Sequence, residues 1–426
     1  MLFVVRPHVA ILGLLFFSCA VHAQTAQVKA QWMLERLTGV KWPADSPLIA
    51  EMTAKVEAGD LKGAAAFATA QDQFYSVVVK EMAAKMSTRE ESVRVELNDF
   101  TSTVIGAVRD EMDFRQVLFG NFSYAVDPAK VAGMDPAFPM DVLRNNNHYR
   151  ALERSNLKVS EVLIKVDGQK IPTAAAADIA NPDPAGILTS RASRGAHAIA
   201  GTNRRLVEYT FRQFMCVPIE KWADTASFET RIGRDIDRAP GGDPVRFQTT
   251  CKGCHTGMDG FRGAFAKYDY RDMGNGAGAV LHADSGATGN YQPDRDGNGV
   301  ATKLNRPNFI QYAGGWVSTN DSFENYTNRP GSVNATQFGW RAPASDPDAG
   351  LAGRTTGVHA FGRLIANSAR FSGCMAQHVW NAVCKRSLPS AELDMTFVSL
   401  GLEFESNQYN MKKLFGIVAS HPKCKM

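Results

Sequence analysis

Two cysteines and a histidine at fixed spacing are the residues of this chain best suited to chemistry. Cys251 and Cys254 are three positions apart and His255 follows directly, which makes the C-x-x-C-H pattern of covalent haem attachment. The two thiols can form thioether bonds to the two vinyl groups of one haem, and the imidazole then becomes an axial ligand of the iron. The sequence therefore predicts one covalent haem c, attached through Cys251 and Cys254, with His255 as the proximal iron ligand.

Two other uses of a C-x-x-C pair fit this chain less well. A redox-active pair has no need of the histidine and usually lies in a βαβ unit, a pattern that the sequence does not show. A structural zinc site needs four ligands, and the sequence has no second C-x-x-C pair to complete one.

The sixth iron ligand decides what such a haem does. Methionine or histidine there gives a saturated iron that transfers electrons, whereas an open position permits reactions with peroxide or other small molecules. Met273 and His282 follow the motif closely enough to reach the distal side of the iron. Met375 and His378, on a C-terminal helix, are longer-range candidates. Met258 comes about one helical turn after the proximal histidine, so it is expected on the proximal side. The choice between Met273 and His282 stays open.

Part of a calcium-binding pattern lies in a long segment, 274–350, that is rich in Gly, Asn, Asp and Pro. Asp294, Asp296 and Asn298 have the spacing of the first three oxygen ligands of a calcium loop, and a glycine follows them. Asn305 stands where such a loop carries a bidentate glutamate. A calcium ion is therefore one interpretation of this segment, and a plain Asp/Gly turn is the other.

The N-terminus has the composition of a secretory signal peptide. Arg6 precedes an apolar run over Val9–Phe17, and a small-residue cleavage site follows at Ala23. The run is too short for a membrane span. Residues 1–23 are therefore expected to be removed, which leaves a periplasmic or secreted chain with no transmembrane segment. Lipid attachment at Cys19 is an alternative. Export agrees with covalent haem attachment, which in bacteria takes place outside the cytoplasm.

Four cysteines remain for disulfides once the haem pair and the signal peptide are set aside: Cys216, Cys374, Cys384 and Cys424. Cys374 and Cys384 fall in one predicted helix, where ten residues span about 15 Å. That exceeds the limit of about 7 Å between the Cα atoms of a disulfide. Two pairings are left, 216–374 with 384–424 or 216–384 with 374–424. Buried free thiols are the alternative.

Apolar periodicity predicts a mainly α fold with at most a short β-hairpin. Residues 25–120 are expected to form helices, with Ser46 as an N-cap before a proline and a capping box over Ser87–Glu90. Residues 162–171 are expected to form a hairpin that turns at an Asp-Gly pair. Helices return from Phe371 onwards.

The residues around the haem motif resemble a known family. Cys251–Asp269 continues from the motif with Met-Asp, Gly-Phe and an aromatic-Asp pair. In this it is similar to the cytochrome c-like domain of secreted proteins first noted in planctomycetes. Gly186–Ser190, Arg204–Cys216 and Phe371–Arg386 resemble further segments of that family, although Lys385-Arg386 replaces its usual Gly-Arg ending. The resemblance implies a haem-binding redox protein and says little about a substrate.

The predicted organisation has four parts. They are a signal peptide over 1–23, a helical N-terminal domain over 24–155, a cytochrome c-like haem module over 156–300, and a loop-rich insert with a C-terminal helical segment over 301–426. The sequence shows no catalytic acid–base set, which favours electron transfer with a redox partner protein or a small-molecule donor or acceptor. A haem enzyme of peroxidase or oxidase type with an open iron site is the alternative. The formal net charge of +4 gives no reason to expect a nucleic-acid partner, and none is predicted.

Overall fold

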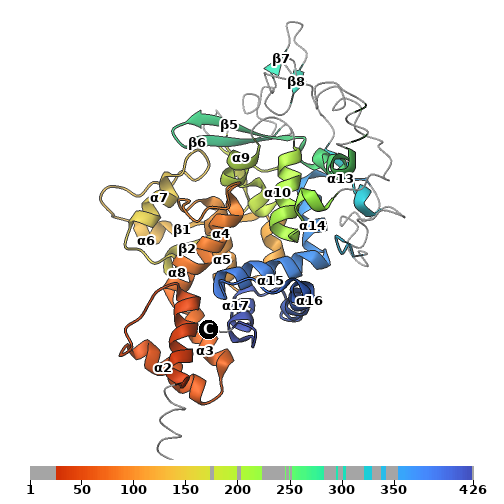
Figure 1. The fold of residues 1–426 in the computed structure, drawn as a ribbon. Coiled ribbons are helices and arrows are strands. Elements are labelled where there is room, and N and C mark those ends of the chain that lie inside the picture. The colour runs from red at the N-terminus through yellow and green to blue at the C-terminus, as the bar shows by residue number, and fades with distance from the viewer. Residues whose placement is uncertain are drawn as a thin grey trace, which may run out of the picture.

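Helices dominate the computed structural model of the chain (Figure 1), which confirms the predicted fold class. It describes residues 25–172, 177–198, 203–222, 245, 249, 252–282, 294–295, 301–303, 321–328, 337–341 and 354–424. Within these residues every sheet has two strands. None of the described helices combines the length and the hydropathy that crossing a membrane requires. The predicted signal peptide lies outside the described residues.

The N-terminal part folds into helices, as predicted. They are a helix over 25–38, α2 (Pro47–Glu57), α3 (Leu61–Thr69), the π-helix η1 (Phe74–Val79), α4 (Lys80–Ser87), α5 (Asp99–Arg109) and the 3-10 helix η2 (Phe114–Leu118). Ser46 caps α2 as predicted, because its side chain accepts a hydrogen bond from the Leu48 amide at 3.3 Å. The capping box predicted over Ser87–Glu90 is wrong, since α4 ends at Ser87. The box lies at the start of α5, where Asn98 and Thr101 exchange hydrogen bonds.

Helix α5 lies at the centre of this part of the protein. All residues from Asp99 to Val108 are buried, and the helix contacts α4, η2, β1 (Phe122–Val126) and α9 (Arg191–His197). A Cβ atom on Gly106 would lie 2.1 Å from the ring of Tyr124 in β1. The missing side chain at Gly106 is therefore what lets α5 and β1 share one core.

The hairpin predicted over 162–171 does not form. The elements in this region are α6 (Pro128–Val131), α7 (Asn147–Arg154), α8 (Val159–Val162), β2 (Leu163–Asp167), β3 (Lys170–Ile171) and β4 (Ile179–Ala180). Strand β2 pairs with β1, with Phe122 opposite Asp167, while β3 pairs with β4. Gly168 still turns the chain, with a φ of 80°, but its amide donates to the Asn121 carbonyl. The Asp-Gly pair thus leads from one sheet to another, because the partner of β2 lies far upstream in the sequence.

A buried histidine links β1 to α7. Nε2 of His148 accepts a hydrogen bond from the Val126 amide at 2.9 Å, and Nδ1–H donates to the Pro139 carbonyl at 2.7 Å. An amide can only donate and a carbonyl can only accept, so the two bonds together require the neutral ring. Burial lowers the pKa of His148, although the bond to Pro139 acts in the opposite direction.

We expect His148 to make the protein less stable in mild acid. Its pKa is lower in the folded protein than in the unfolded chain, so the unfolded state takes up the proton first. The contribution of the neutral His148 ring to the free energy of unfolding is complete above a pH of about 6.5. It is lost as the pH falls toward the pKa of the folded protein, by at most about 1.4 kcal/mol per pH unit. Urea unfolding of the wild type and of H148Q at a pH of about 7.5 and about 5 measures it. The glutamine can accept from the Val126 amide without titrating, so H148Q should lose less stability on acidification. Equal losses in the two proteins would contradict this role.

Four helices form the C-terminal end: α14 (Gly357–Ala366), α15 (Ala369–Val383), α16 (Ser390–Ser406) and α17 (Met411–Ser420). The predicted apolar face of α15 is buried along its length. Helix α15 contacts α10 (Arg204–Met215), α16 and α17. Helix α17 also packs against α3, where Gly416 faces Ala65, so the last described helix lies against a helix from the N-terminal part of the chain (Figure 1).

Two disulfides cross-link the described residues. Cys216, the residue after α10, is bonded to Cys374 of α15. Cys384, the residue after α15, is bonded to Cys424. This is one of the two predicted pairings, and it rules out the other. The first disulfide joins α10 to α15 across a sequence separation of 158 residues.

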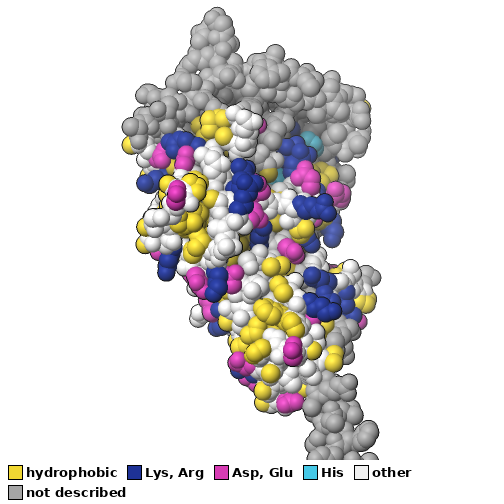
Figure 2. All heavy atoms as spheres, turned by 90° about the vertical axis from the view of Figure 1, so that its left-hand side faces the viewer, with side chains coloured by type: hydrophobic (Ala, Val, Ile, Leu, Met, Phe, Trp, Pro, Cys, Tyr) yellow, Lys and Arg dark blue, Asp and Glu magenta, His cyan; other side chains and the backbone are white. Residues whose placement is uncertain are grey.

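The face shown in Figure 2 carries charges of both signs. Lys and Arg side chains are interspersed with Asp and Glu side chains over its described part. This mixture agrees with the small formal net charge of +4 for the whole chain.

The elements around the haem motif are shorter. They are η3 (Gly186–Thr189), η4 (Ile219–Lys221), α13 (Lys252–Phe261), η6 (Arg262–Phe265), β5 (Tyr268–Gly274), β6 (Ala277–His282), β7 (Asp294–Arg295), β8 (Ala301–Lys303), β9 (Ser322–Glu324), η7 (Tyr326–Asn328) and β10 (Arg354–Thr356). Strands β5 and β6 form a hairpin, β7 pairs with β8, and β9 pairs with β10.

Candidate haem-attachment site

Helix α13 carries the described part of the haem motif. Cys254 and His255 lie near its start, while Cys251 falls outside the described residues. The helix packs against α10, η6, β9 and η7, and it lies beside α10 in Figure 1. Met258 of the same helix is buried in the core. The motif is therefore presented by a helix that other elements hold in place.

Two glycines let α13 and the turn after it lie directly against strand β9. A Cβ atom on Gly260 would lie 2.5 Å from the carbonyl oxygen of Glu324, and one on Gly263 would lie 2.0 Å from that of Ser322. These distances are too short for any side chain, so the backbones themselves are in contact. The glycine spacing after the haem motif thus fixes the position of α13 on β9.

The thiol of Cys254 lies half-buried where α13 meets η4. Its Sγ atom is 3.6 Å from the carbonyl oxygen of Ile219. The other four cysteines of the described residues form the two disulfides, in which Cys254 takes no part. Neither disulfide therefore competes with the predicted use of Cys254 in haem attachment.

His255 faces a buried carboxylate one helical turn further along α13. Its Nδ1 atom lies 3.4 Å from Oδ2 of Asp259, a long hydrogen bond, and the two side chains are 23% and 1% exposed. Arg204, at the start of α10, binds the same carboxylate through two nitrogens. Its Nη2 lies 2.9 Å from Oδ2 and its Nε lies 2.5 Å from Oδ1. Two-point binding of this kind is the strong, directional form of an arginine–carboxylate pair.

The carboxylate determines which nitrogen of the imidazole carries the hydrogen. Burial by itself would raise the pKa of Asp259, but the hydrogen bonds and charges of Arg204 and His255 outweigh burial and lower it. An ionised carboxylate can only accept, so Nδ1 of His255 carries the hydrogen. Nε2, on the opposite side of the ring, is then the nitrogen suited to iron. With a cysteine directly before this histidine, the described residues fit a covalently bound haem.

The two predicted distal ligands lie at opposite ends of the β5–β6 hairpin. His282 pairs with Tyr268, the first residue of β5, so the hairpin returns it to the end nearer α13. Its side chain is buried, and its ring centroid lies 4.6 Å from that of Tyr268. Met273 lies beside the tip of the hairpin and is 50% exposed. Of the two, His282 is thus the buried one and the one that returns toward the motif.

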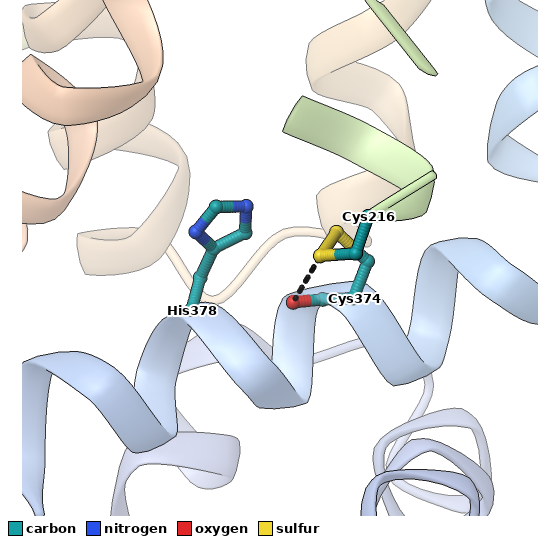
Figure 3. Close-up of side chains that lie close together, drawn as sticks. All are labelled: Cys216, Cys374 and His378. Atoms are coloured by element: carbon teal, nitrogen blue, oxygen red, sulfur yellow. Dashed lines mark hydrogen bonds between the residues drawn. A yellow bond between two sulfur atoms is a disulfide. The ribbon is translucent and has the colours of Figure 1, made fainter. Parts of the chain in front are cut away.

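The longer-range candidates are engaged elsewhere. Met375 is buried in the core, and Nε2–H of His378 donates a hydrogen bond to the Gln213 carbonyl at 2.8 Å. Figure 3 shows His378 beside the Cys216–Cys374 disulfide, on the same helix as Cys374. The three side chains bring their ligand atoms within 4.8 Å of one another. The two sulfurs are bonded to each other, however, so they cannot act as thiolate ligands in this state.

The predicted calcium ligands are described only in part. Asp294 belongs to β7, which pairs with β8, whereas Asp296 and Asn298 lie outside the described residues. Calcium binding in this segment stays a prediction.

Arg204 and Asp259 belong to the site although neither residue was predicted from the sequence to have a role in it. For Asp259 a signal exists, because residues four positions apart in a helix share a face and this aspartate stands four positions after His255. For Arg204 there is none. It is 55 residues upstream of Asp259 and meets it only in the folded protein.

No family model, curated protein or solved structure matches this chain. The class of protein is therefore indicated by the site itself. Its features are a thiol and an imidazole adjacent in one helix, and a buried carboxylate that holds the imidazole.

Proposed function

We propose that the protein is an exported c-type cytochrome that carries one covalent haem and transfers electrons. The observation that carries this proposal is the contact between His255 and Asp259. A ring whose Nδ1–H points at a buried carboxylate presents Nε2 to a metal in one orientation. The C-x-x-C-H motif and the resemblance to the cytochrome c-like domain of secreted proteins support the same class.

The residues of the site have separate roles in this proposal. Cys251 and Cys254 hold the haem covalently, and His255 is the proximal ligand. When bound, the haem supplies one-electron oxidation and reduction at its iron. Asp259 keeps the hydrogen on Nδ1 of the ring, and Arg204 keeps Asp259 in place.

Aromatic packing makes the surroundings of α13 rigid. Phe261 at the end of α13 and Trp222 after η4 both contact Phe211 of α10, at ring-centroid distances of 5.2 and 4.4 Å. All three side chains are buried. A close-packed interior moves little when a nearby charge changes, which suits a protein that gains and loses electrons.

Export of the chain is part of the proposal. Disulfides persist in oxidising compartments and are rare in the cytosol, and the described residues hold two. The signal-peptide pattern of residues 1–23 points in the same direction. We therefore propose a periplasmic or secreted location, with a redox partner protein or a small-molecule donor or acceptor.

A haem enzyme of peroxidase or oxidase type is the second candidate function. One observation favours it: a hydrogen bond from Nδ1 of His255 to Asp259 makes the imidazole more basic. A strongly donating proximal ligand favours cleavage of an O–O bond at the iron. The sixth ligand separates the two candidates. Coordination of the iron by His282 would make the protein a carrier, whereas an open position would permit catalysis.

Covalent haem is the first property to test. The purified protein should stain for haem after denaturing electrophoresis and show reduced c-type absorption bands. C251A/C254A should lose both signals. C384S/C424S, which removes two cysteines outside the motif, should keep them. Haem that stays with denatured C251A/C254A would contradict the proposal.

Carbon monoxide then distinguishes a carrier from an enzyme. Reduced bands that carbon monoxide leaves unchanged support a saturated iron, and bands that shift support an open site. If His282 is the sixth ligand, H282A should convert a protein insensitive to carbon monoxide into one that binds it. M273A, which changes the other predicted ligand, is the matched control and should behave as the wild type does.

A further inference from the structure

Asp259 connects a positive charge on α10 to the imidazole of the haem motif. Its Oδ2 atom is shared, since it lies 2.9 Å from Nη2 of Arg204 and 3.4 Å from Nδ1 of His255. Its Oδ1 atom accepts a hydrogen bond from Nε of Arg204. The guanidinium and the imidazole therefore share one carboxylate oxygen as their hydrogen-bond acceptor.

The carboxylate is fixed in this position. Asp259 is buried, Arg204 is 11% exposed, and the two make a two-point contact that prevents the carboxylate from turning. His255 is four residues away on the same helix face, so the ring and the carboxylate stay opposed. Water is largely excluded from the pair, and charges there act more strongly than at the surface.

In the haem-loaded protein, the charge on that oxygen would control how strongly His255 donates to iron. A fully negative acceptor at Nδ1 makes the imidazole a stronger donor, which stabilises the oxidised iron and lowers the reduction potential. A guanidinium on the same oxygen withdraws charge from it. The guanidinium therefore weakens the hydrogen bond between Nδ1 of His255 and the carboxylate, and it raises the reduction potential of the haem.

We propose that Asp259 and Arg204 are opposed positioning residues that set the reduction potential of the haem held by His255. Asp259 lowers the potential through its hydrogen bond to the ring, and Arg204 limits this effect by holding the same oxygen. The inference rests on the proposed function, because it needs a haem iron bound to His255. A pair that only joined α10 to α13 would not shift the potential in two directions.

Redox titration of the haem-loaded variants tests this inference. D259N keeps a hydrogen-bond acceptor and removes the charge, so its equilibrium should shift about tenfold toward the reduced protein, which is about +59 mV for a one-electron couple. R204Q keeps an amide donor and removes the positive charge, so its equilibrium should shift toward the oxidised protein. D259E, which restores a carboxylate, should return the potential toward the wild-type value.

The double variant separates the hydrogen bond from a charge that acts through space. If Arg204 acts through the carboxylate, R204Q should change the potential in the wild type and leave it unchanged in the D259N background. An equal R204Q shift in both backgrounds would overturn the proposal. R212Q is the matched control, because Arg212 lies on the same helix and pairs with Glu208. Its potential should equal that of the wild type.

Haem staining of each variant distinguishes a failure of the proposed function from a failure of the proposed role of Asp259. A wild type without covalent haem contradicts the proposed function itself. A haem-loaded wild type and a haem-loaded D259N with equal potentials overturn only the role of Asp259. Where D259N does not accumulate, R204Q carries the test, since it leaves Asp259 in place. An R204Q potential at or above the wild-type value then overturns the proposal.

Discussion

Replacing Arg204 by Met should lower the free energy of unfolding by about 3–5 kcal/mol, because it leaves a buried carboxylate without its charged partner. Asp259 is 1% exposed, so water cannot take over the role of the guanidinium. The remaining contact with His255 is long, at 3.4 Å, so it cannot replace the two-point contact of the guanidinium. Urea unfolding near neutral pH measures the loss.

Two further variants make this prediction specific. R212M removes an arginine from the same helix, but Arg212 and Glu208 form a pair that is 40% and 20% exposed, which is worth at most about 1 kcal/mol. R204M/D259N removes the buried charge together with its partner and should recover much of the stability lost in R204M. If R204M and R212M lose equal amounts, Asp259 is not a buried charge that depends on Arg204.

Removing the Cys216–Cys374 disulfide should cost more stability than removing Cys384–Cys424. In the chain-entropy model the loss grows with the length of the closed loop. A separation of 158 residues corresponds to about 5 kcal/mol and one of 40 residues to about 4 kcal/mol. The first disulfide also joins α10 to α15, two helices that pack against each other.

Urea unfolding of C216S/C374S and of C384S/C424S checks the order of these two losses. The wild type under reducing conditions should lose more than either double variant. A greater loss for C384S/C424S would show that local packing around Cys384 and Cys424, rather than loop length, decides the contribution of each disulfide.

Local patterns of the sequence predicted the helices and failed where distant segments pair. The buried face of α15 follows from apolar spacing within one helix, and the Ser46 cap follows from neighbouring residues. The hairpin expected over 162–171 is wrong because strand pairing depends on β1, which the local pattern cannot reveal. The disulfide pairing was narrowed by helix length alone, and only the folded chain selects one of the two solutions.

In the candidate site, too, residues with local sequence signals could be predicted, and residues brought in by tertiary packing could not. Cys254 and His255 are recognisable because attachment chemistry fixes their spacing in the sequence. The helical spacing of His255 and Asp259 is also local, and it could have been noticed. Arg204 has no such signal, since its place in the site depends on how α10 packs against α13. Chemistry that acts through a neighbouring helix stays hidden until the fold is known.

The contact between α3 and α17 has a consequence for how the chain is made. Helix α3 has only nine residues, and a helix this short is unstable alone in water. Its partner α17 is synthesised far later, and at about 5–20 residues per second the interval between them is on the order of 20–70 s. During that time the newly made N-terminal segment lacks the surface that covers Ala65. Helix α3 can therefore complete its packing only after α17 has been made, near the end of synthesis.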